Sequence, residues 1–307
     1  MRVVFLGTPE FAVPSLAALL AADVEVAAVV TQPDRPSTRS HSRLTAPPVK
    51  RFARAAGLPV WQPERPRGDA FFDQLRSVDA DLGVVVAYGH LLPRELLEIP
   101  HAGLVNVHAS LLPRWRGAAP IQWALLSGDP ETGVSIMRIA TGLDTGPVWH
   151  QERIAIGADD TAGSLALRLA TLGASTLVAT LPAVARGDVP MAQSDAGITH
   201  APKIDRATAR IRWHDPAVSV SSRIRAMDPA PGAWTVLDGK EIKLFGATVV
   251  ASHTTTPGRI VEHASRLLVE TGDGAVEIVA VQPAGRRRIA AREWLNGAHF
   301  TGPSRFE

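Results

Sequence analysis

Cysteine is absent from this chain of 307 residues. Its absence excludes disulfide frameworks, thiolate metal sites, iron–sulfur clusters and cysteine nucleophiles, and we expect a protein of the reducing cytoplasm. The chain also lacks an apolar run of about 18 residues, so we expect no segment that spans a membrane. The apolar start, Met1–Gly7, is interrupted by Thr8-Pro9-Glu10 too early for a signal peptide.

A large excess of charge of one sign is lacking too, since 32 basic side chains face 30 acidic ones. The net charge of +2 therefore indicates no nucleic-acid partner by itself. The hydrophobic share of 46% excludes a disordered chain, and the 25 glycines and 24 prolines are scattered rather than periodic. At this length a single core is hard to extend, so we expect two domains.

In the first half of the chain, short apolar runs alternate with segments that read as helices. This alternation is typical of a parallel sheet covered on both faces. Thr8 is placed to cap the helix after the first run. A hairpin is expected over 134–139 and 148–156, followed by a long helix from about Thr161 to Ala185. The strands expected before the hairpin are 2–7, 25–31, 81–88 and 104–108.

The composition changes after Gly187. Residues 188–207 are polar and interrupted by prolines, which is typical of a linker. Beyond them lie short β-type runs separated by turns such as Asp238-Gly239, and this pattern predicts a small barrel or sandwich. We therefore expect a first domain over 1–189, a linker over 190–206 and a second domain over 207–307.

Two polar residues lie near the end of the apolar run 104–108. Residues two apart share one face of a strand, so Asn106 and His108 are expected to project together. Strand ends in open α/β sheets are also where ligands bind. An amide beside an imidazole can hold a carbonyl oxygen and manage a proton, although a hydrogen-bonded core pair explains the same pattern.

A third candidate lies between two glycines. Gly142 and Gly146 flank Asp144 and allow the backbone to bring this carboxylate against another segment. An ordinary turn that contains an aspartate is the alternative. The segment 111–121, rich in proline, glycine and small residues, predicts a loop that closely approaches its surroundings.

Three motifs follow one another along the chain: N-V-H-A-S-L-L-P at 106–113, R-G-A-A-P-I at 116–121 and G-L-D-T-G at 142–146. Together they resemble the folate-dependent formyltransferase family. The resemblance implies an α/β catalytic domain of Rossmann-like fold with a mostly parallel sheet, and transfer of a formyl group from 10-formyltetrahydrofolate to an amine. No metal is implied. The family's catalytic asparagine, histidine and aspartate correspond to Asn106, His108 and Asp144.

Motifs outside this centre resemble the members of the family that act on a charged tRNA. They include F-L-G-T-P-E-F-A-V-P at 5–14, T-Q-P-D-R-P at 31–36, A-P-K-I at 201–204 and Q-P-A-G-R-R at 282–287. The resemblance implies that the acceptor is the α-amine of methionine on initiator methionyl-tRNA, for translation initiation. It also implies that the smaller C-terminal domain is an OB-like β-barrel that binds tRNA. No obligatory protein partner is implied.

The resemblance also assigns residues to folate. The loop Ser110, Leu111, Leu112 and Pro113 is implied to bind the co-substrate, and an apolar slot for the pterin is expected beside Val86 and Tyr88. A dinucleotide cofactor is not expected, because the run at 7–9 lacks the G-x-G-x-x-G fingerprint.

Two groups of arginines are candidates for tRNA contact, with solvated surface charge as the alternative. Arg39 and Arg43 lie in a segment where the family has a loop rich in glycine and lysine, and here both residue types are missing. Arg286 and Arg287 belong to the expected second domain.

Three other functions fit the same motifs. A formyltransferase acting on an amino sugar or a small amine shares the central motifs. A folate- or tRNA-binding module without catalysis needs only the binding residues. A hydrolase that releases formate from the same co-substrate needs no acceptor.

Overall fold

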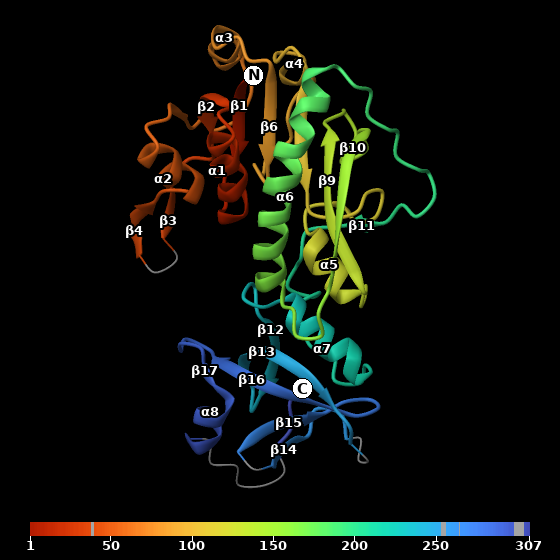
Figure 1. Cartoon of the computed structure of the whole chain (residues 1–307). Helices are drawn as coiled ribbons and strands as arrows, with labels where there is room; N and C mark the ends of the chain where they lie inside the picture. Colours follow the sequence, from red (N-terminus) through yellow and green to blue (C-terminus); the bar gives the residue numbers. More distant parts are fainter. Residues whose placement is uncertain (38–39, 253–255, 264, 298–303) are drawn as a thin grey trace. The chain divides into compact units, whose positions relative to one another are not determined.

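The computed structural model describes residues 1–37, 40–252, 256–263, 265–297 and 304–307 (Figure 1). The chain forms two compact units whose sequence ranges interleave. The first unit comprises Met1–Gly117, Gly133–Ile154 and Ala166–His200. The second comprises Ala118–Thr132, Ala155–Leu165 and Ala201–Glu307.

The first unit is built on a seven-stranded sheet in the order β10-β9-β7-β6-β1-β2-β5. The five strands from β7 to β5 run parallel, and β9 joins them antiparallel to β7. The mostly parallel sheet predicted from the apolar runs is therefore confirmed. The strands are β1 (Arg2–Gly7), β2 (Glu25–Val30), β5 (Val60–Trp61), β6 (Leu82–Val86), β7 (Leu104–His108), β9 (Glu131–Arg138) and β10 (Val148–Ala155).

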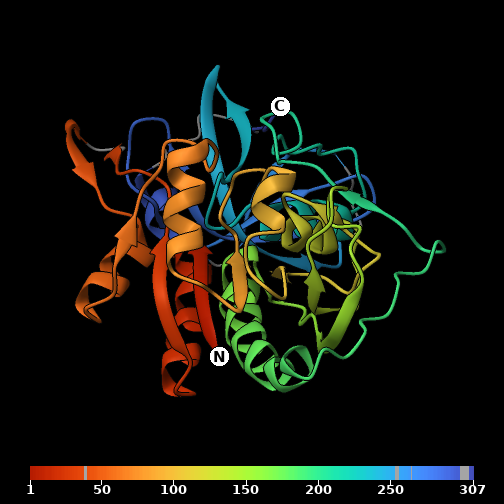
Figure 2. The same ribbon diagram turned by 90° about the horizontal axis from the view of Figure 1, so that it is seen from above.

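Both faces of this sheet are buried, which explains why its strands are apolar throughout. Along β1, Val3 and Phe5 join one core while Val4 and Leu6 join another. The first core includes residues of α1 (Val13–Ala21), α2 (Pro48–Ala55) and α6 (Ala162–Ala185). The second includes residues of α3 (Asp69–Ser77) and α4 (Arg94–Leu97), and Figure 2 shows these two helices across the sheet from α6.

Helix α6 packs closely on the sheet through a glycine. A Cβ atom on Gly173 would lie 2.7 Å from Cγ1 of Val107 in β7, so the absence of a side chain permits this approach. By length and composition alone α6 is long and apolar enough to cross a membrane, and half of its most apolar window is buried. Its residues Leu177, Leu181 and Val184 belong to the first core, as in a core helix of this composition.

The expected loop after residue 34 contains regular structure. β3 (Arg35–Ser37) and β4 (Ser40–Thr45) pair antiparallel as a hairpin. Arg39 lies outside the described residues, and Arg43 belongs to β4 although its side chain is outside the described set.

Thr8 does not cap a helix, so this expectation was wrong. A short 3-10 helix over Glu10–Ala12 follows Pro9 without a side-chain cap. The Thr8 hydroxyl instead donates to the Tyr88 carbonyl and accepts from the Gln32 N–H. These longer-range hydrogen bonds tie together the ends of β1 and β6.

The second unit contains an antiparallel sheet in the order β12-β13-β16-β15-β14, with β17 paired to β16. The short strands predicted after the polar segment are thereby confirmed. Helix α5 (Pro120–Leu126) also belongs to this unit. The remaining elements are α7 (Ala217–Ala226), β12 (Ala233–Leu237), β13 (Lys240–Val250), β14 (Ile260–His263), β15 (Arg266–Glu270), β16 (Ala275–Pro283), β17 (Ile289–Ala290) and α8 (Ala291–Gly297).

The last described residues connect the two end strands of this sheet. The Ile260 N–H in β14 donates to the Ser304 carbonyl, and the Glu307 N–H donates to the Val236 carbonyl in β12. Between them Phe306 is buried and its ring stacks on Trp213, with 5.5 Å between the ring centroids. Residues 304–307 thus occupy the gap that the strand order leaves open.

Candidate active site

His108 lies at the carboxyl end of β7 and is buried. Its Nε2 lies 2.9 Å from the Trp115 carbonyl oxygen. A carbonyl only accepts hydrogen bonds, so Nε2 carries a proton and donates it. In the neutral imidazole this leaves the lone pair on Nδ1, which faces the Asp144 carboxylate with 3.8 Å between Nδ1 and Oδ2.

Asp144 reaches His108 from the connection between β9 and β10. Its Oδ2 accepts a hydrogen bond of 2.8 Å from the Gly117 N–H, and 13% of its side chain is exposed. Close backbone packing beside it requires glycine, because a Cβ on Gly146 would lie 1.8 Å from the Arg138 carbonyl oxygen. Gly146 therefore acts as the sequence predicted.

Asn106 lies two residues before His108 on the same face of β7, as predicted. In the sheet it pairs with Val85 on one side and Met137 on the other. Its side chain is half-buried, and within the described ranges no hydrogen bond occupies its amide. An amide and an imidazole thus share one face of β7, and the Asp144 carboxylate approaches the imidazole. This arrangement suits stabilisation of an oxyanion with transfer of a proton.

The predicted folate loop follows His108 directly and is held by two residues that the sequence analysis missed. Ser135 donates to the Ser110 carbonyl at 2.6 Å and accepts from the Leu112 N–H at 3.1 Å. Gln151 donates to the Leu112 carbonyl at 2.9 Å and to the Ser135 hydroxyl at 2.8 Å. Ser110 and Leu112 are buried, whereas Leu111 and Pro113 are half-buried.

Val86 and Tyr88 lie at the carboxyl end of β6 with their side chains in the two cores. Tyr88 is 1% exposed, its hydroxyl has no hydrogen-bond partner among the described residues, and burial raises its pKa to about 12. Its carbonyl accepts hydrogen bonds from Thr8 and Gln32. The intervening Ala87 is exposed, so the backbone at this strand end reaches solvent.

The polar segment predicted as a linker belongs to the first unit as far as His200 and makes specific contacts within it. The Thr199 hydroxyl accepts a hydrogen bond of 2.8 Å from the Trp115 N–H, and the Thr199 carbonyl accepts one of 3.0 Å from the Arg116 N–H. Residues 113–117 therefore adjoin this segment as well as His108 and Asp144.

The arginines at 286–288 differ in their surroundings. Arg286 and Arg287 are exposed. Arg288 instead pairs with Asp228, with 2.8 Å between Nη1 and Oδ1, and its guanidinium lies 4.1 Å from the centroid of the Phe245 ring. Arg288 is exposed as well, but its guanidinium is engaged by Asp228 and Phe245, whereas its two neighbours have no such contact among the described residues.

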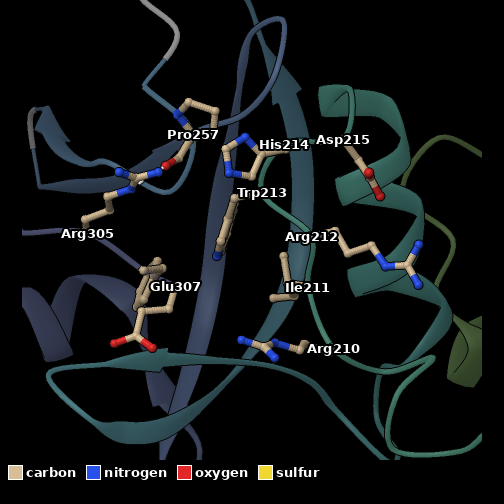
Figure 3. Close-up of a pocket in the computed structure, with 10 residues that line it drawn as sticks. Arg210, Ile211, Arg212, Trp213, His214, Asp215, Pro257, Arg305 and Glu307 are labelled. Carbon is tan, nitrogen blue, oxygen red and sulfur yellow. Dashed lines mark hydrogen bonds between the residues drawn. The ribbon is translucent and has the colours of Figure 1, made fainter.

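A cavity of about 740 Å³ lies in the second unit, and none of the three candidate catalytic residues lines it. Figure 3 shows Trp213 at its middle, with Arg210 and Arg305 on different sides of the indole and Arg212 extending away. A second cavity of about 400 Å³ lies in the first unit, at the ends of β1 and β2, and four prolines help to line it. These are Pro33, Pro36, Pro47 and Pro48.

The site residues described above include no evident set of metal ligands. Over the part of the chain that the structure describes, no group of three or more His, Asp or Glu side chains is arranged to hold a metal ion.

Two family models match this chain. The model described as formyl transferase matches residues 1–181, and the model described as formyl transferase, C-terminal domain, matches residues 203–299. The methionyl-tRNA formyltransferase of Methylococcus capsulatus is 46% identical over 307 residues, covering 98% of both chains. That of Chromobacterium violaceum is also 46% identical, covering 99% of both.

Solved structures share the fold at lower identity. HypX from Aquifex aeolicus in complex with tetrahydrofolic acid has a TM-score of 0.67 and 18% identity, and the match covers 100% of this chain. This chain spans about half of HypX, 51% of its length. An N-formyltransferase from Helicobacter canadensis, solved with folinic acid and dTDP-3-aminofucose, has a TM-score of 0.66 and 17% identity over 92% of this chain and 99% of its own. The motifs around His108, both family models and the full-length relatives agree that this chain belongs to the formyltransferase family.

Proposed function

We propose that this chain transfers the formyl group of 10-formyltetrahydrofolate to the α-amine of methionine on initiator methionyl-tRNA, in the cytoplasm, for translation initiation. The observation that carries the proposal is the approach of His108 to Asp144, 3.8 Å between Nδ1 and Oδ2, with Asn106 on the same face of β7 as His108. The choice of acceptor is supported by the names of relatives 46% identical over nearly the whole chain.

The reaction needs help at two points. The amine nitrogen forms a bond to the formyl carbon, the bond from that carbon to N10 breaks, and one proton moves from the amine to the leaving nitrogen. Negative charge develops on the formyl oxygen during the attack. The Asn106 amide is free to donate a hydrogen bond to that oxygen, which stabilises it more in the transition state than in the substrate.

His108 is suited to carry the proton. Because its Nε2–H is held by the Trp115 carbonyl, its Nδ1 is the basic atom and accepts the proton from the attacking amine. The Asp144 carboxylate then stabilises the imidazolium across 3.8 Å. The same proton is returned to the leaving nitrogen, so His108 ends in its starting state.

We assign the folate contacts to the loop Ser110, Leu111, Leu112 and Pro113 and to the strand end at Val86 and Tyr88. The loop adjoins His108 and is fixed by Ser135 and Gln151, as a binding loop for a rigid ring requires. Since the Tyr88 side chain is in the core, we assign its contribution to the backbone.

We assign the tRNA contacts to Arg39, Arg43, Arg286 and Arg287. Exposure of Arg286 and Arg287 supports this role, because phosphate contacts need guanidinium groups that are not engaged elsewhere. We also propose that the second unit is an OB-like barrel, which is supported by the hydrogen bonds of residues 304–307 to both β14 and β12.

Formylation of a panel of acceptors tests the proposal. Purified protein is incubated with 10-formyltetrahydrofolate and either methionyl-tRNA, uncharged tRNA or an amino sugar nucleotide, and formylated acceptor is measured. We expect product from methionyl-tRNA alone, with no formate released when the acceptor is omitted. Preference for the amino sugar, or formate release without acceptor, contradicts the proposal.

A further inference from the structure

Gln193 lies in the polar segment that follows α6 and uses its whole amide in hydrogen bonds. Its Nε2 donates to the Asp144 carbonyl at 2.8 Å and to the Gly146 carbonyl at 2.7 Å. Its Oε1 accepts from Arg116, at 3.0 Å from Nε and 2.7 Å from Nη2. A primary amide has two N–H donors and two carbonyl lone pairs, so both ends are saturated.

These bonds complete a closed ring around the catalytic carboxylate. Arg116 is followed by Gly117, whose N–H donates to Oδ2 of Asp144. Gln193 therefore joins the Arg116 side chain to the backbone of Asp144. Gly117, the residue after Arg116, holds the carboxylate of the same aspartate. The ring fixes Asp144 from the backbone side and the carboxylate side together.

The backbone of Asp144 needs such support. Its φ of 51° lies in the left-handed region, which costs a residue with a side chain about 1–3 kcal/mol unless the surroundings hold it there. A hydrogen bond to its own carbonyl, and another to the Gly146 carbonyl two residues on, fix the peptide groups that follow Asp144 and Gly146.

We propose that Gln193 is a positioning residue for the catalytic centre, acting through Asp144 on His108. The proposal rests on the proposed function and extends it to a segment whose composition is that of a linker. The polar connection between the two sequence-matched domains thereby contributes to the geometry of the site.

Only glutamine among similar side chains makes this ring. Glutamate retains the bonds from Arg116 but places a carboxylate oxygen against two carbonyl oxygens. Methionine keeps the length of the side chain and removes all four hydrogen bonds. The pair Gln193→Glu and Gln193→Met therefore separates the Arg116 contact from the contact with the Asp144 turn.

The test is a double-mutant cycle on formylation of methionyl-tRNA. We expect Gln193→Met and Gln193→Glu each to lower kcat about 100-fold, as a displacement of about 1 Å does at a catalytic group, with little change in the KM for 10-formyltetrahydrofolate. In an Asp144→Asn background we expect Gln193→Met to cost less than about 3-fold, because residues that act as a unit are not additive.

Hydrogen exchange supplies a readout that does not depend on activity. We expect the backbone N–H groups within 140–147, where Pro147 has none, to exchange faster in Gln193→Met than in the unsubstituted protein, while the melting temperature changes little. Gln74→Met, at an exposed position of α3, is the matched control and is expected to change neither kcat nor exchange.

Two results overturn the inference: unchanged kcat in Gln193→Met, or the same fold-loss with and without the Asp144 carboxylate. A failure of the proposed function is distinguishable, because the unsubstituted protein then forms no formylmethionyl-tRNA. In that case unchanged exchange over 140–147 in Gln193→Met still overturns the positioning role, and faster exchange still supports it.

Discussion

Asn106 contributes an amide donor at the point where charge is proposed to develop. Loss of one such donor typically costs about 10²–10³ in turnover. We therefore expect Asn106→Ala and Asn106→Asp to lower kcat by this factor, since aspartate replaces the donor by a carboxylate. Steady-state formylation with a matched melting curve measures the effect. Asn296→Ala, at an exposed position of α8, is the control, and equal kcat for Asn106→Ala and the control removes Asn106 from the mechanism.

Tyr88 illustrates a residue whose side chain and backbone play different parts. Its hydroxyl is buried without a hydrogen-bond partner in the described chain, which is also why its pKa is raised to about 12. Tyr88→Phe removes that unpaired hydroxyl, so we expect unfolding free energy to stay equal or to rise by about 1 kcal/mol. Urea unfolding measures this change. We expect no change in the KM for folate. A marked increase in this KM contradicts our assignment of the folate contact at Tyr88 to its backbone.

At the scale of elements, sequence reasoning worked where the local pattern agreed with the fold. β7 has its predicted bounds, because an apolar run is a local signal. Sequence reasoning failed where contacts with residues far away in the chain determine the secondary structure. Residues 217–220, Ala-Val-Ser-Val, alternate as in a strand, and the helix α7 was overlooked although Pro216 precedes its first turn.

The same distinction explains which residues of the candidate site could be predicted from the sequence. Asn106 and His108 follow from strand periodicity, and the glycines beside Asp144 are visible in the sequence. Ser135, Gln151 and Gln193 carry no local signal, because each acts through a partner at least 16 residues away. Only the folded chain brings these side chains to the loops that they hold.

The hairpin β3–β4 is anchored at its base by an ion pair. Lys50 of α2 is buried and its Nζ lies 2.7 Å from Oδ1 of Asp34, directly before β3. The hydrogen bond from Lys50 lowers the pKa of Asp34. We expect Asp34→Asn to reduce unfolding free energy at neutral pH by about 1–3 kcal/mol, because it leaves a buried ammonium without its charged partner.

The pH dependence of this anchor has a defined sign. A carboxyl with a lowered folded-state pKa contributes its full stability above the unfolded value of about 3.9 and loses it as pH falls through the folded value. The difference in unfolding free energy between Asp34→Asn and the unsubstituted protein should therefore disappear in acid. Urea unfolding at several pH values measures this difference. Asp73→Asn, which breaks an exposed pair with Arg76, is the control with a much smaller effect. A difference in unfolding free energy that persists in acid contradicts the stabilising role of the Asp34–Lys50 ion pair.

On the scale of the whole molecule, binding of a polyanion must come from local charge, since the net charge is only +2. We expect Arg286→Ala with Arg287→Ala to raise the KM for methionyl-tRNA. We also expect the slope of the logarithm of the binding constant against the logarithm of the salt concentration to fall in magnitude by about one per lost phosphate contact. The KM for folate should not change. Arg76→Ala, at an exposed position of α3, controls for loss of charge alone. An unchanged salt dependence excludes the pair from tRNA contact.

The measurement that tests the central claim most directly is formation of formylmethionyl-tRNA by the unsubstituted protein and by His108→Ala, side by side, with 10-formyltetrahydrofolate in excess. We expect rapid product with the histidine present and a rate about 100-fold or more lower without it, at an unchanged melting temperature. Equal rates for the two proteins, or no product from either, contradict the account.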